Sequence, residues 1–395
     1  MGTRDIAYVS GAAVRWARER ARLEAATLAS KLGKGFTAAH VSAWEAGQSF
    51  PTLSQAERLA DSLYVPLAIL FMQDPPDIAL PLPDFRTVSG ERPGPPSPEF
   101  FDVLNDALIR QHWYREYQLR EKRPPLEFVG RFRLGDDVAR VAADVSSTLG
   151  IDDQTRRDCE TWQGFLTRLI EAAEGAGILV MVSNLVRHAT SRPLNVSEFR
   201  GFTSADRLAP LIFLNSRDAR AGLVFTLAHE LAHVWIAASG ISSSDPRRRW
   251  SDFSSPVERY CNAVAAEFLL PEANFKGAWR ETGTIEEKIA RISAFHRVSK
   301  IVTIIRAREL GALSYEQSRN FIDAEYARFE EQRERQKEKE GGPVFWTLFP
   351  SRNSARLTDA VLGELQYGRV TFRDAAYLLG VKLGTLEKYR AQKAG

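Results

Sequence analysis

Hydrophobic residues in the first part of the chain recur at the spacing of helices. Between residues 12 and 72 they mark several short segments, which turn-forming residues separate at Gly33–Gly35 and Gly47–Pro51. No alternation of polar and apolar residues indicates a strand there. The pattern predicts a compact helical bundle whose core contains Leu23, Leu28, Leu32, Val41, Trp44, Leu53, Leu59, Leu63, Leu67 and Leu70.

Two proline-rich stretches follow this bundle. They read QDPPDIALPLPDF (73–85) and SGERPGPPSP (89–98). Because proline cannot continue a helix and stiffens a linker, we expect a domain to end near residue 75. Helical spacing returns from Glu99 to about Thr148, with aromatic residues on a packing face.

The centre of the chain combines short apolar runs with two helices. GILVMVSNLV (177–186) and APLIFLN (209–215) are rich in Val, Ile and Phe, which is typical of buried strands. A helix containing residues 229–233 follows, and then a polar loop at 241–255. A second helix begins near Pro256 and ends before Pro271. The predicted order is strand, helix, loop, helix.

Beyond residue 275 the pattern is again helical. The segment 323–340 is almost entirely charged, which predicts an exposed helix or tail that ends at Gly341 and Gly342. The last stretch predicts two short helices around a turn at Gly380 and Val381, which we interpret as a packing element. The expected fold class is therefore mainly α with a small β-sheet (α+β), in four parts: 1–75, 76–159, 160–275 and 276–395.

Composition places the chain among globular proteins. Its 44% of hydrophobic and 26% of charged residues exclude a disordered chain. The first twenty residues carry charges where a signal peptide needs an apolar stretch, and no apolar run approaches the ~20 residues of a membrane helix. We therefore expect a cytoplasmic protein without membrane contact. Cys159 and Cys261 are too few for a disulfide framework, so we expect reduced thiols.

The net charge of +3 is too small to indicate a partner. The distribution of charge is more informative, because basic residues crowd the stretch 15–34, in which only Glu19 and Glu24 are acidic. Such a cluster can form a surface patch that binds the phosphates of a nucleic acid, or it can simply be the solvent-exposed face of a helix. Its members are Arg15, Arg18, Arg20, Arg22, Lys31 and Lys34.

The segment His229-Glu230-Leu231-Ala232-His233 carries the strongest chemical pattern in the chain. Residues four apart lie on the same face of a helix, so both imidazoles can face one ion. This HExxH spacing is the zincin signature, in which zinc activates a water molecule and the glutamate between the histidines is the general base. We therefore predict His229 and His233 as Zn²⁺ ligands and Glu230 as the catalytic residue.

A third ligand must come from elsewhere in the chain. The second helix offers Glu258, Glu267 and Glu272. We favour Glu258, because Asn262 lies one turn further along and can hydrogen-bond a ligating histidine. Glu267 lies nine residues from Glu258, on the opposite side of the helix, so both cannot reach one ion.

Other polar side chains receive weaker assignments. A peptidase also needs a group that stabilises the tetrahedral intermediate, and Tyr260, His188 and Arg217 are candidates that the sequence does not rank. The isolated histidines are interpreted as surface or capping residues; they are His40, His112, His188 and His296.

The central segment resembles the ImmA/IrrE metallopeptidases. IFLNSRDARAGLVFTLAHELAHVWI followed by VERYCNAVAAEFLLP matches their apolar strand ending in Asn, their FTLAHELGH and their E-x-x-A-N-x-x-A-x-x-x-L-x-P. The resemblance implies that Glu258 is the third zinc ligand, Asn262 its helix-mate and Glu267 a carboxylate that does not ligate. Two small residues depart from the pattern: Ala232 replaces a frequent Gly, and Cys261 a usual Ala.

The amino-terminal bundle resembles a lambda-repressor-like (Xre-type) helix-turn-helix domain. LEAATLASKLG, a turn, TAAHVSAWEAGQSFPT and LSQAERLADSLYVPLAILF carry this resemblance. It implies that a helix from about Thr37 enters the major groove of DNA, while Trp44 and Glu45 have packing and capping roles. The turn before this helix is longer than usual. The implied DNA contacts are Lys34, Thr37, Ala38, Ala39, His40 and Ser42.

Together the two resemblances cover residues 12–72 and about 160–275. They imply a DNA-binding regulator with a zinc endopeptidase domain that cleaves a partner repressor or antitoxin. Such a regulator can form a homodimer. The amino-terminal helical bundle could also be a module that docks another molecule and does not bind DNA. The rival interpretation is a non-proteolytic regulator or antitoxin whose zinc domain senses a ligand or docks a partner.

Overall fold

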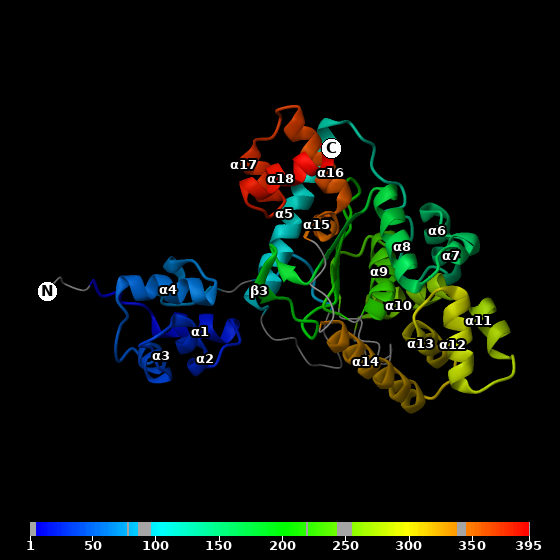
Figure 1. Cartoon of the computed structure of the whole chain (residues 1–395), viewed down its shortest axis with the longest axis horizontal. Helices are drawn as coiled ribbons and strands as arrows, with labels where there is room; N and C mark the ends of the chain where they lie inside the picture. The colour runs from blue at the N-terminus through cyan, green and yellow to red at the C-terminus, as the bar shows by residue number, and fades with distance from the viewer. Residues whose placement is uncertain are drawn as a thin grey trace. The chain divides into compact units, whose positions relative to one another are not determined.

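The computed structural model describes residues 5–76, 79–85, 96–218, 220–242, 255–337 and 345–394 (Figure 1). It contains two compact units. The first comprises Met1–Pro81 and Gly94–Asp102, and the second comprises Leu82–Pro93 and Val103–Gly395. Most of the predicted proline-rich stretch 89–98, most of the polar loop 241–255 and the predicted helix end at Gly341 and Gly342 lie outside the described residues.

The first unit is a bundle of short helices, as its hydrophobic spacing predicts. Its elements are α1 (Gly11–Arg20), α2 (Ala25–Leu32), α3 (Ala38–Glu45), α4 (Leu53–Leu63) and the 3-10 helix η1 (Leu67–Phe71). Side-chain caps fix two of the helix starts: the Ser10 hydroxyl accepts from the Ala13 N–H, and the Thr52 hydroxyl accepts from the Gln55 N–H.

Most of the predicted core residues of this bundle are buried. Leu23 and Leu67 are partly buried and pack against the core. The prediction that Leu53 lies in the core is wrong, because this residue is 41% exposed. It is the first residue of α4 and lies beside the N-cap Thr52, where the helix surface faces away from the bundle. The residues confirmed as core are Leu28, Leu32, Val41, Trp44, Leu59, Leu63 and Leu70.

The predicted basic cluster does not form one exposed patch. The Arg18 guanidinium donates to both carboxylate oxygens of Glu45, which ties α1 to the end of α3. Arg20 is buried and lies over the rings of Trp16 and Phe101. Arg15 also pairs with Glu45, and the Lys31 ammonium lies over the Tyr64 ring. The exposed members of the cluster are Arg15, Arg22, Lys31 and Lys34.

A mixed sheet forms the centre of the second unit. Its strands are β1 (Leu179–Ser183), β4 (Gly201–Ser204), β5 (Leu211–Asn215) and β6 (Gly240–Ser242), in the order β1-β5-β4-β6. β1 pairs with β5 in parallel, and β4 pairs antiparallel with both β5 and β6. A separate two-stranded ribbon joins β2 (Leu185–Val186) and β3 (Ala189–Pro193).

Helices make up most of the rest of the second unit, and the first of them, α5, begins in the first unit. They are α5 (Pro98–Arg120), α6 (Val138–Leu149), α7 (Asp153–Asp158), α8 (Trp162–Ala176), α9 (Arg220–Trp235), α10 (Pro256–Leu269), α11 (Glu272–Trp279), α12 (Ile285–His296), α13 (Lys300–Glu309), α14 (Tyr315–Lys337), α15 (Phe345–Asn353), α16 (Ala355–Gln366), α17 (Phe372–Leu378) and α18 (Leu383–Ala394). In Figure 1 the sheet stands between α9 on one side and α5 and α15 on the other.

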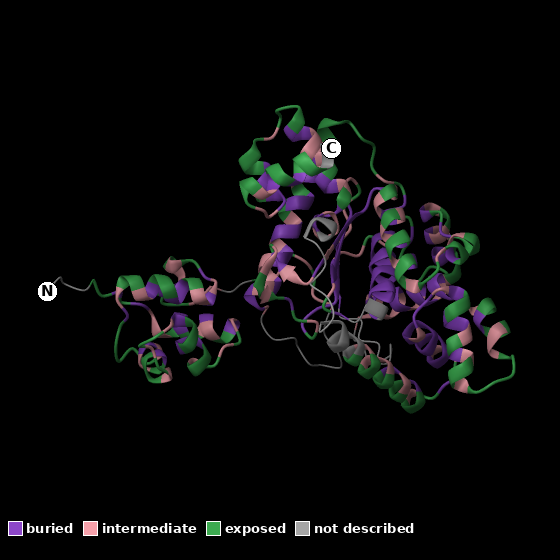
Figure 2. Cartoon of the chain, viewed as in Figure 1, coloured by how far each residue is buried: buried purple, intermediate pink, exposed green. Residues whose placement is uncertain are grey.

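Both faces of the sheet are covered, which explains the continuous apolar run in β5. Ile212 and Leu214 belong to the core shared with α9 and α10, whereas the Phe213 ring stacks on Phe202 at 4.9 Å. Figure 2 shows the buried strands and α9 at the centre of this unit. The core extends from Phe128 to Ile322, so residues on both sides of the predicted boundaries at 159 and 275 share it.

The α+β class predicted from the sequence is confirmed. The predicted strand runs contain β1 and β5, and α9 and α10 follow in the predicted order. The short strands β3, β4 and β6 were not predicted. The C-terminal helices pack as expected: α15 and α16 contact β1, and the Arg110 Nε donates to the Leu378 carbonyl. Across the described ranges, no helix combines the length and apolar character needed to cross a membrane.

Candidate metal centre

Helix α9 places two histidines side by side in the interior of the second unit. His229 and His233 lie one turn apart, their ring centroids are 4.8 Å apart, and both are 0% exposed. The surrounding residues of α9 are apolar and buried, and they hold the helix against β4 and β5. Packing on both sides of α9 therefore fixes where the two imidazoles point.

The hydrogen bonds of the two rings define which nitrogens are free. The His229 Nδ1 lies 2.9 Å from the Asn262 Oδ1, and the His233 Nδ1 lies 2.9 Å from the Ala238 carbonyl oxygen. Both partners are acceptors, so each Nδ1 carries the proton and each Nε2 presents a lone pair. The two Nε2 atoms are only 3.0 Å apart. Two lone pairs at this separation favour a cation between them.

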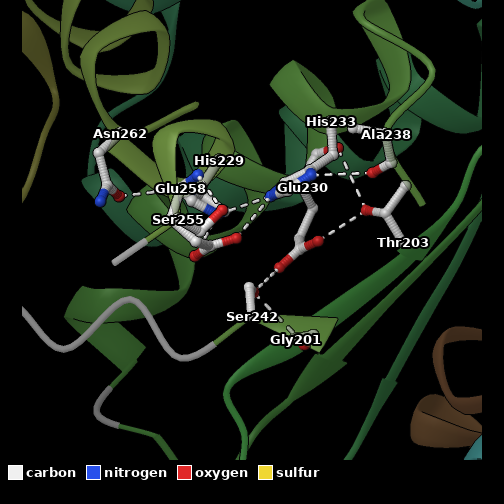
Figure 3. Close-up of polar contacts among 10 residues, drawn as sticks. All are labelled: Gly201, Thr203, His229, Glu230, His233, Ala238, Ser242, Ser255, Glu258 and Asn262. Carbon is white, nitrogen blue, oxygen red and sulfur yellow. Dashed lines mark hydrogen bonds and ion pairs between the residues drawn. The ribbon is translucent and has the colours of Figure 1, made fainter. Parts of the chain in front are cut away.

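Glu258 completes the cluster from the first turn of α10. Ser255 and Pro256 start this helix, and the Ser255 hydroxyl accepts from the Glu258 N–H. One carboxylate oxygen of Glu258 lies 3.1 Å from the His233 Nε2, and the other lies 3.4 Å from the His229 Nε2. The ligand atoms of the three residues lie within 4.8 Å of one another. The predicted ligand set thus converges on one point (Figure 3).

The donor set fits a metal ion. The Glu258 Oε2 is buried and has no hydrogen-bond partner among the described residues. A buried carboxylate oxygen without a partner is costly, whereas coordination satisfies it. Two imidazole nitrogens and one carboxylate oxygen are typical ligands of a catalytic zinc ion and leave further positions open. These three residues could therefore hold a divalent ion.

The charge state of Glu258 leads to the same interpretation. Burial raises the pKa of Glu258, but positive charge on the facing imidazoles of His229 and His233, which a bound cation would supply in their place, outweighs burial and lowers this pKa to about 2. The carboxylate is therefore ionised at neutral pH and needs a positive partner. Burial raises the pKa of the neighbouring Cys261 thiol, and the ligand cluster of the described residues consists of His229, His233 and Glu258 without Cys261.

Glu230 points from α9 toward the sheet, below the ligand cluster (Figure 3). The Thr203 hydroxyl donates to one of its carboxylate oxygens at 2.6 Å, and the Ser242 hydroxyl donates to the other. Each oxygen keeps a further lone pair. Sequence reasoning missed Thr203 and Ser242, because they lie on the unpredicted strands β4 and β6 and a lone Ser or Thr carries no recognisable pattern.

Gly201 leaves the space that Glu230 occupies. A Cβ at this position would lie 2.6 Å from the Glu230 Oε1 and 3.0 Å from the Phe213 carbonyl oxygen. We expect Gly201→Ala to lower the free energy of unfolding by about 1–3 kcal/mol, since the backbone oxygen cannot move away. Urea unfolding measures this. Gly277→Ala is the control, because a Cβ there meets no atom within 4 Å; equal loss in both variants would contradict the steric account.

Asn262 orients His229 without being a ligand. Asn262→Ala removes the acceptor of the His229 Nδ1–H, so the ring is free to rotate away from the cluster. We expect the affinity for zinc to fall by about 10- to 100-fold, as measured by competition with a chelator. Asn195→Ala, at an exposed position, is the control and should keep the original affinity. An unchanged affinity in Asn262→Ala would show that the contact does not orient the ring.

The other acidic candidates lie away from the cluster. Glu267 forms an ion pair with Arg306, and Glu272 pairs with Lys276 on the surface of α11. Asn215, which ends the apolar strand β5, is buried and donates to the Phe199 carbonyl at 3.0 Å. Glu267 and Asn215 therefore stabilise the structure around the site.

The three candidates for stabilising a tetrahedral intermediate do not meet at the site. The Tyr260 hydroxyl donates to the Asp136 carbonyl at 2.8 Å. The His188 Nδ1 lies 2.9 Å from a guanidinium nitrogen of Arg352, and Arg217 is exposed in the turn after β5. The contacts described for the Tyr260 and His188 side chains thus join them to residues other than His229, Glu230 and Glu258.

Two isolated histidines differ from their predicted surface or capping roles. His188 is partly buried and stacks on Phe349, and burial and nearby arginines lower its pKa to about 4. His296 is buried at the end of α12. His112 is exposed as predicted, and His40 caps α3 through contacts of its Nδ1 with Thr37.

The residues predicted to contact DNA lie at the start of α3 and in the turn before it. Ala38 is partly buried, and the others are exposed: Lys34, Thr37, Ala39, His40 and Ser42. Trp44 is 3% exposed and packs in the core, and Glu45 binds Arg18 instead of capping the helix. The surface is thus open, and its use in DNA binding stays a prediction.

Comparison with known proteins bears on the second unit. Residues 173–308 match the model of the Peptidase_M78 family, which is described as an IrrE N-terminal-like domain. The matched segment includes His229, Glu230, His233 and Glu258, and it does not include the first unit. No curated protein and no solved structure matched the chain. The match supports a metallopeptidase-type domain of the ImmA/IrrE kind in residues 173–308.

Proposed function

We propose that this protein is a DNA-binding regulator whose second unit is a zinc-dependent endopeptidase that cleaves one partner repressor or antitoxin. The observation that carries the peptidase proposal is the convergence of His229, His233 and Glu258, with Glu230 beside them. The family match to residues 173–308 supports the same type of enzyme.

The residues of this site have separate tasks in peptide hydrolysis. Zinc held by the three ligands would supply Lewis acidity to the scissile carbonyl and to the attacking water. Glu230 takes a proton from that water at a carboxylate oxygen and passes it to the leaving nitrogen. Thr203 and Ser242 hold the Glu230 carboxylate in place, and Asn262 and Ala238 fix the tautomers of the two histidines. The protein therefore supplies a base whose position is set before substrate arrives.

Chelation tests the metal requirement. The purified protein is incubated with zinc and with repressors or antitoxins encoded beside its gene. We expect one of them to be cleaved, cleavage to stop when a chelator removes the metal, and zinc to restore it. Cleavage that survives complete metal removal would contradict the proposal.

The DNA-binding role rests on the exposed start of α3 and on the resemblance of the first unit to Xre-type domains. Lys34→Ala should weaken binding to the promoter of the gene and reduce the slope of log affinity against log salt by about 1, because one phosphate contact is lost. Lys388→Ala removes an equal charge from an exposed position on α18 and is the control. Equal binding by both variants in a gel-shift titration would contradict this use of the bundle.

One observation favours a second candidate function. The four residues of the site are 0% exposed, as expected if the zinc domain only senses a ligand or docks a partner without turnover. Both candidates bind zinc, so metal analysis does not separate them. Substitution of Glu230 does, because only a peptidase needs the base.

A further inference from the structure

The candidate metal site is closed in this structure. His229, Glu230, His233 and Glu258 are each 0% exposed, so a polypeptide cannot reach them without displacing something. One covering group is identifiable. The ring of Phe85 stacks on the ring of His233, with centroids 5.9 Å apart and planes at 13°. Phe85 belongs to the short segment Leu82–Phe85, far from α9 in sequence.

Backbone hydrogen bonds hold this segment on the edge of the sheet. Among the described strands β6 is at the end of the sheet, and Ile241 pairs with Phe202 of β4 on its inner side. On its outer side the Phe85 N–H donates to the Ile241 carbonyl at 3.1 Å, and the Ile241 N–H donates to the Pro83 carbonyl at 2.9 Å. Asp84 thereby forms a parallel bridge with Ile241. The segment satisfies two backbone groups that an open edge leaves unpaired.

Gly240 makes room for the aromatic ring. A Cβ at this position would lie 2.2 Å from the Phe85 Cε2 and 2.3 Å from its Cδ2. The absence of a side chain at Gly240 is therefore what allows the ring to lie against β6. An extended segment with an aromatic side chain therefore fits the outer edge of β6. Three separate features support this: the backbone pairing, the missing Cβ at Gly240 and the stacking of the ring on His233.

We propose that the outer edge of β6, with Gly240 and the face of His233, is a binding surface for an extended peptide that carries an aromatic residue. In this structure its occupant is the chain's own Leu82–Phe85. The segment blocks the site, and a substrate reaches the ligands only after the segment leaves. The inference that the segment blocks catalysis rests on the proposed peptidase function. The inference that the edge of β6 binds an extended peptide does not.

The rate of zinc release tests the blocking segment without relying on catalysis. Zinc-loaded full-length protein is mixed with the chelator 4-(2-pyridylazo)resorcinol. We expect Phe85→Ala to release zinc about tenfold faster, because the ring contact that covers His233 is lost. Phe85→Tyr keeps the ring and should behave like the original chain. The matched control is Phe295→Ala, which removes a ring that is 64% exposed.

Hydrogen exchange at Ile241 provides an independent measure. Loss of the segment frees the Ile241 N–H from the Pro83 carbonyl, so its exchange should accelerate in Phe85→Ala. Phe85→Leu, which keeps apolar bulk but not the ring, replaces the alanine variant if the latter does not fold. Equal zinc release and equal exchange at Ile241 in all folded variants would overturn the proposal.

Cleavage of the repressors or antitoxins encoded beside the gene separates this proposal from the peptidase function. We expect Phe85→Ala to cleave the partner among them about tenfold faster than the original chain. Faster zinc release and exchange without cleavage by any variant would support the surface and contradict the peptidase. Cleavage and zinc release that are equal in all variants would support the peptidase and overturn the blocking segment.

Discussion

Glu230→Gln should abolish cleavage while leaving the metal in place. The substitution keeps the shape of the side chain but removes its ability to accept a proton, and general base catalysis contributes roughly 10²- to 10⁴-fold. We expect turnover of the partner protein to fall by about a thousandfold on this basis. Single-turnover cleavage of the partner, with zinc content measured on the same sample, is the appropriate assay.

Two controls make this result specific. Glu272→Gln changes an exposed carboxylate that pairs with Lys276 and should cleave at the original rate. Zinc content should stay at one ion per chain in Glu230→Gln, because the Glu230 carboxylate is bonded to Thr203 and Ser242 and is not part of the ligand cluster. Equal cleavage by Glu230→Gln and the original chain would exclude the proteolytic role and leave the sensing or docking interpretation.

Glu258→Gln should remove the metal itself. Glu258 is the single carboxylate of the cluster, and its charge balances the ion among buried imidazoles. Loss of a direct ligand should weaken zinc binding by more than the about 10- to 100-fold expected for an outer partner such as Asn262. Competition against a chelator of known affinity measures the change.

The control for this variant lies on the same helix. Glu267→Gln alters the carboxylate that was the alternative third ligand, and in the structure this group pairs with Arg306. It should bind zinc like the original chain. Loss of zinc from Glu267→Gln and retention by Glu258→Gln would reverse the assignment of the third ligand.

The central part of the site could be predicted because its residues follow a helical period. The four-residue spacing of His229 and His233, and of Glu258 and Asn262, places each pair on one helix face whatever the rest of the fold is. The structure brings these two faces together, with the Asn262 amide oxygen on the His229 Nδ1. The long apolar run of β5 was equally visible, since both of its faces are buried.

The remaining parts of the site depend on tertiary contacts. β4 and β6 contain four and three residues, too few for a period to emerge, and they carry Thr203 and Ser242. Phe85 reaches His233 across more than a hundred residues of sequence, from a proline-rich stretch that composition marks only as a linker. Similarly, nothing in the sequence shows that Arg20 is buried against Phe101 instead of facing solvent.

The location of the metal in the zinc-loaded protein tests the assignment of His229, His233 and Glu258 as its ligands directly. A crystal of the full chain, with anomalous diffraction recorded on both sides of the zinc edge, gives this location without reference to activity. We expect one strong peak within coordination distance, about 2.0–2.2 Å, of the His229 Nε2, the His233 Nε2 and a Glu258 carboxylate oxygen. A zinc peak elsewhere, or none at these three residues in zinc-saturated protein, would contradict this assignment.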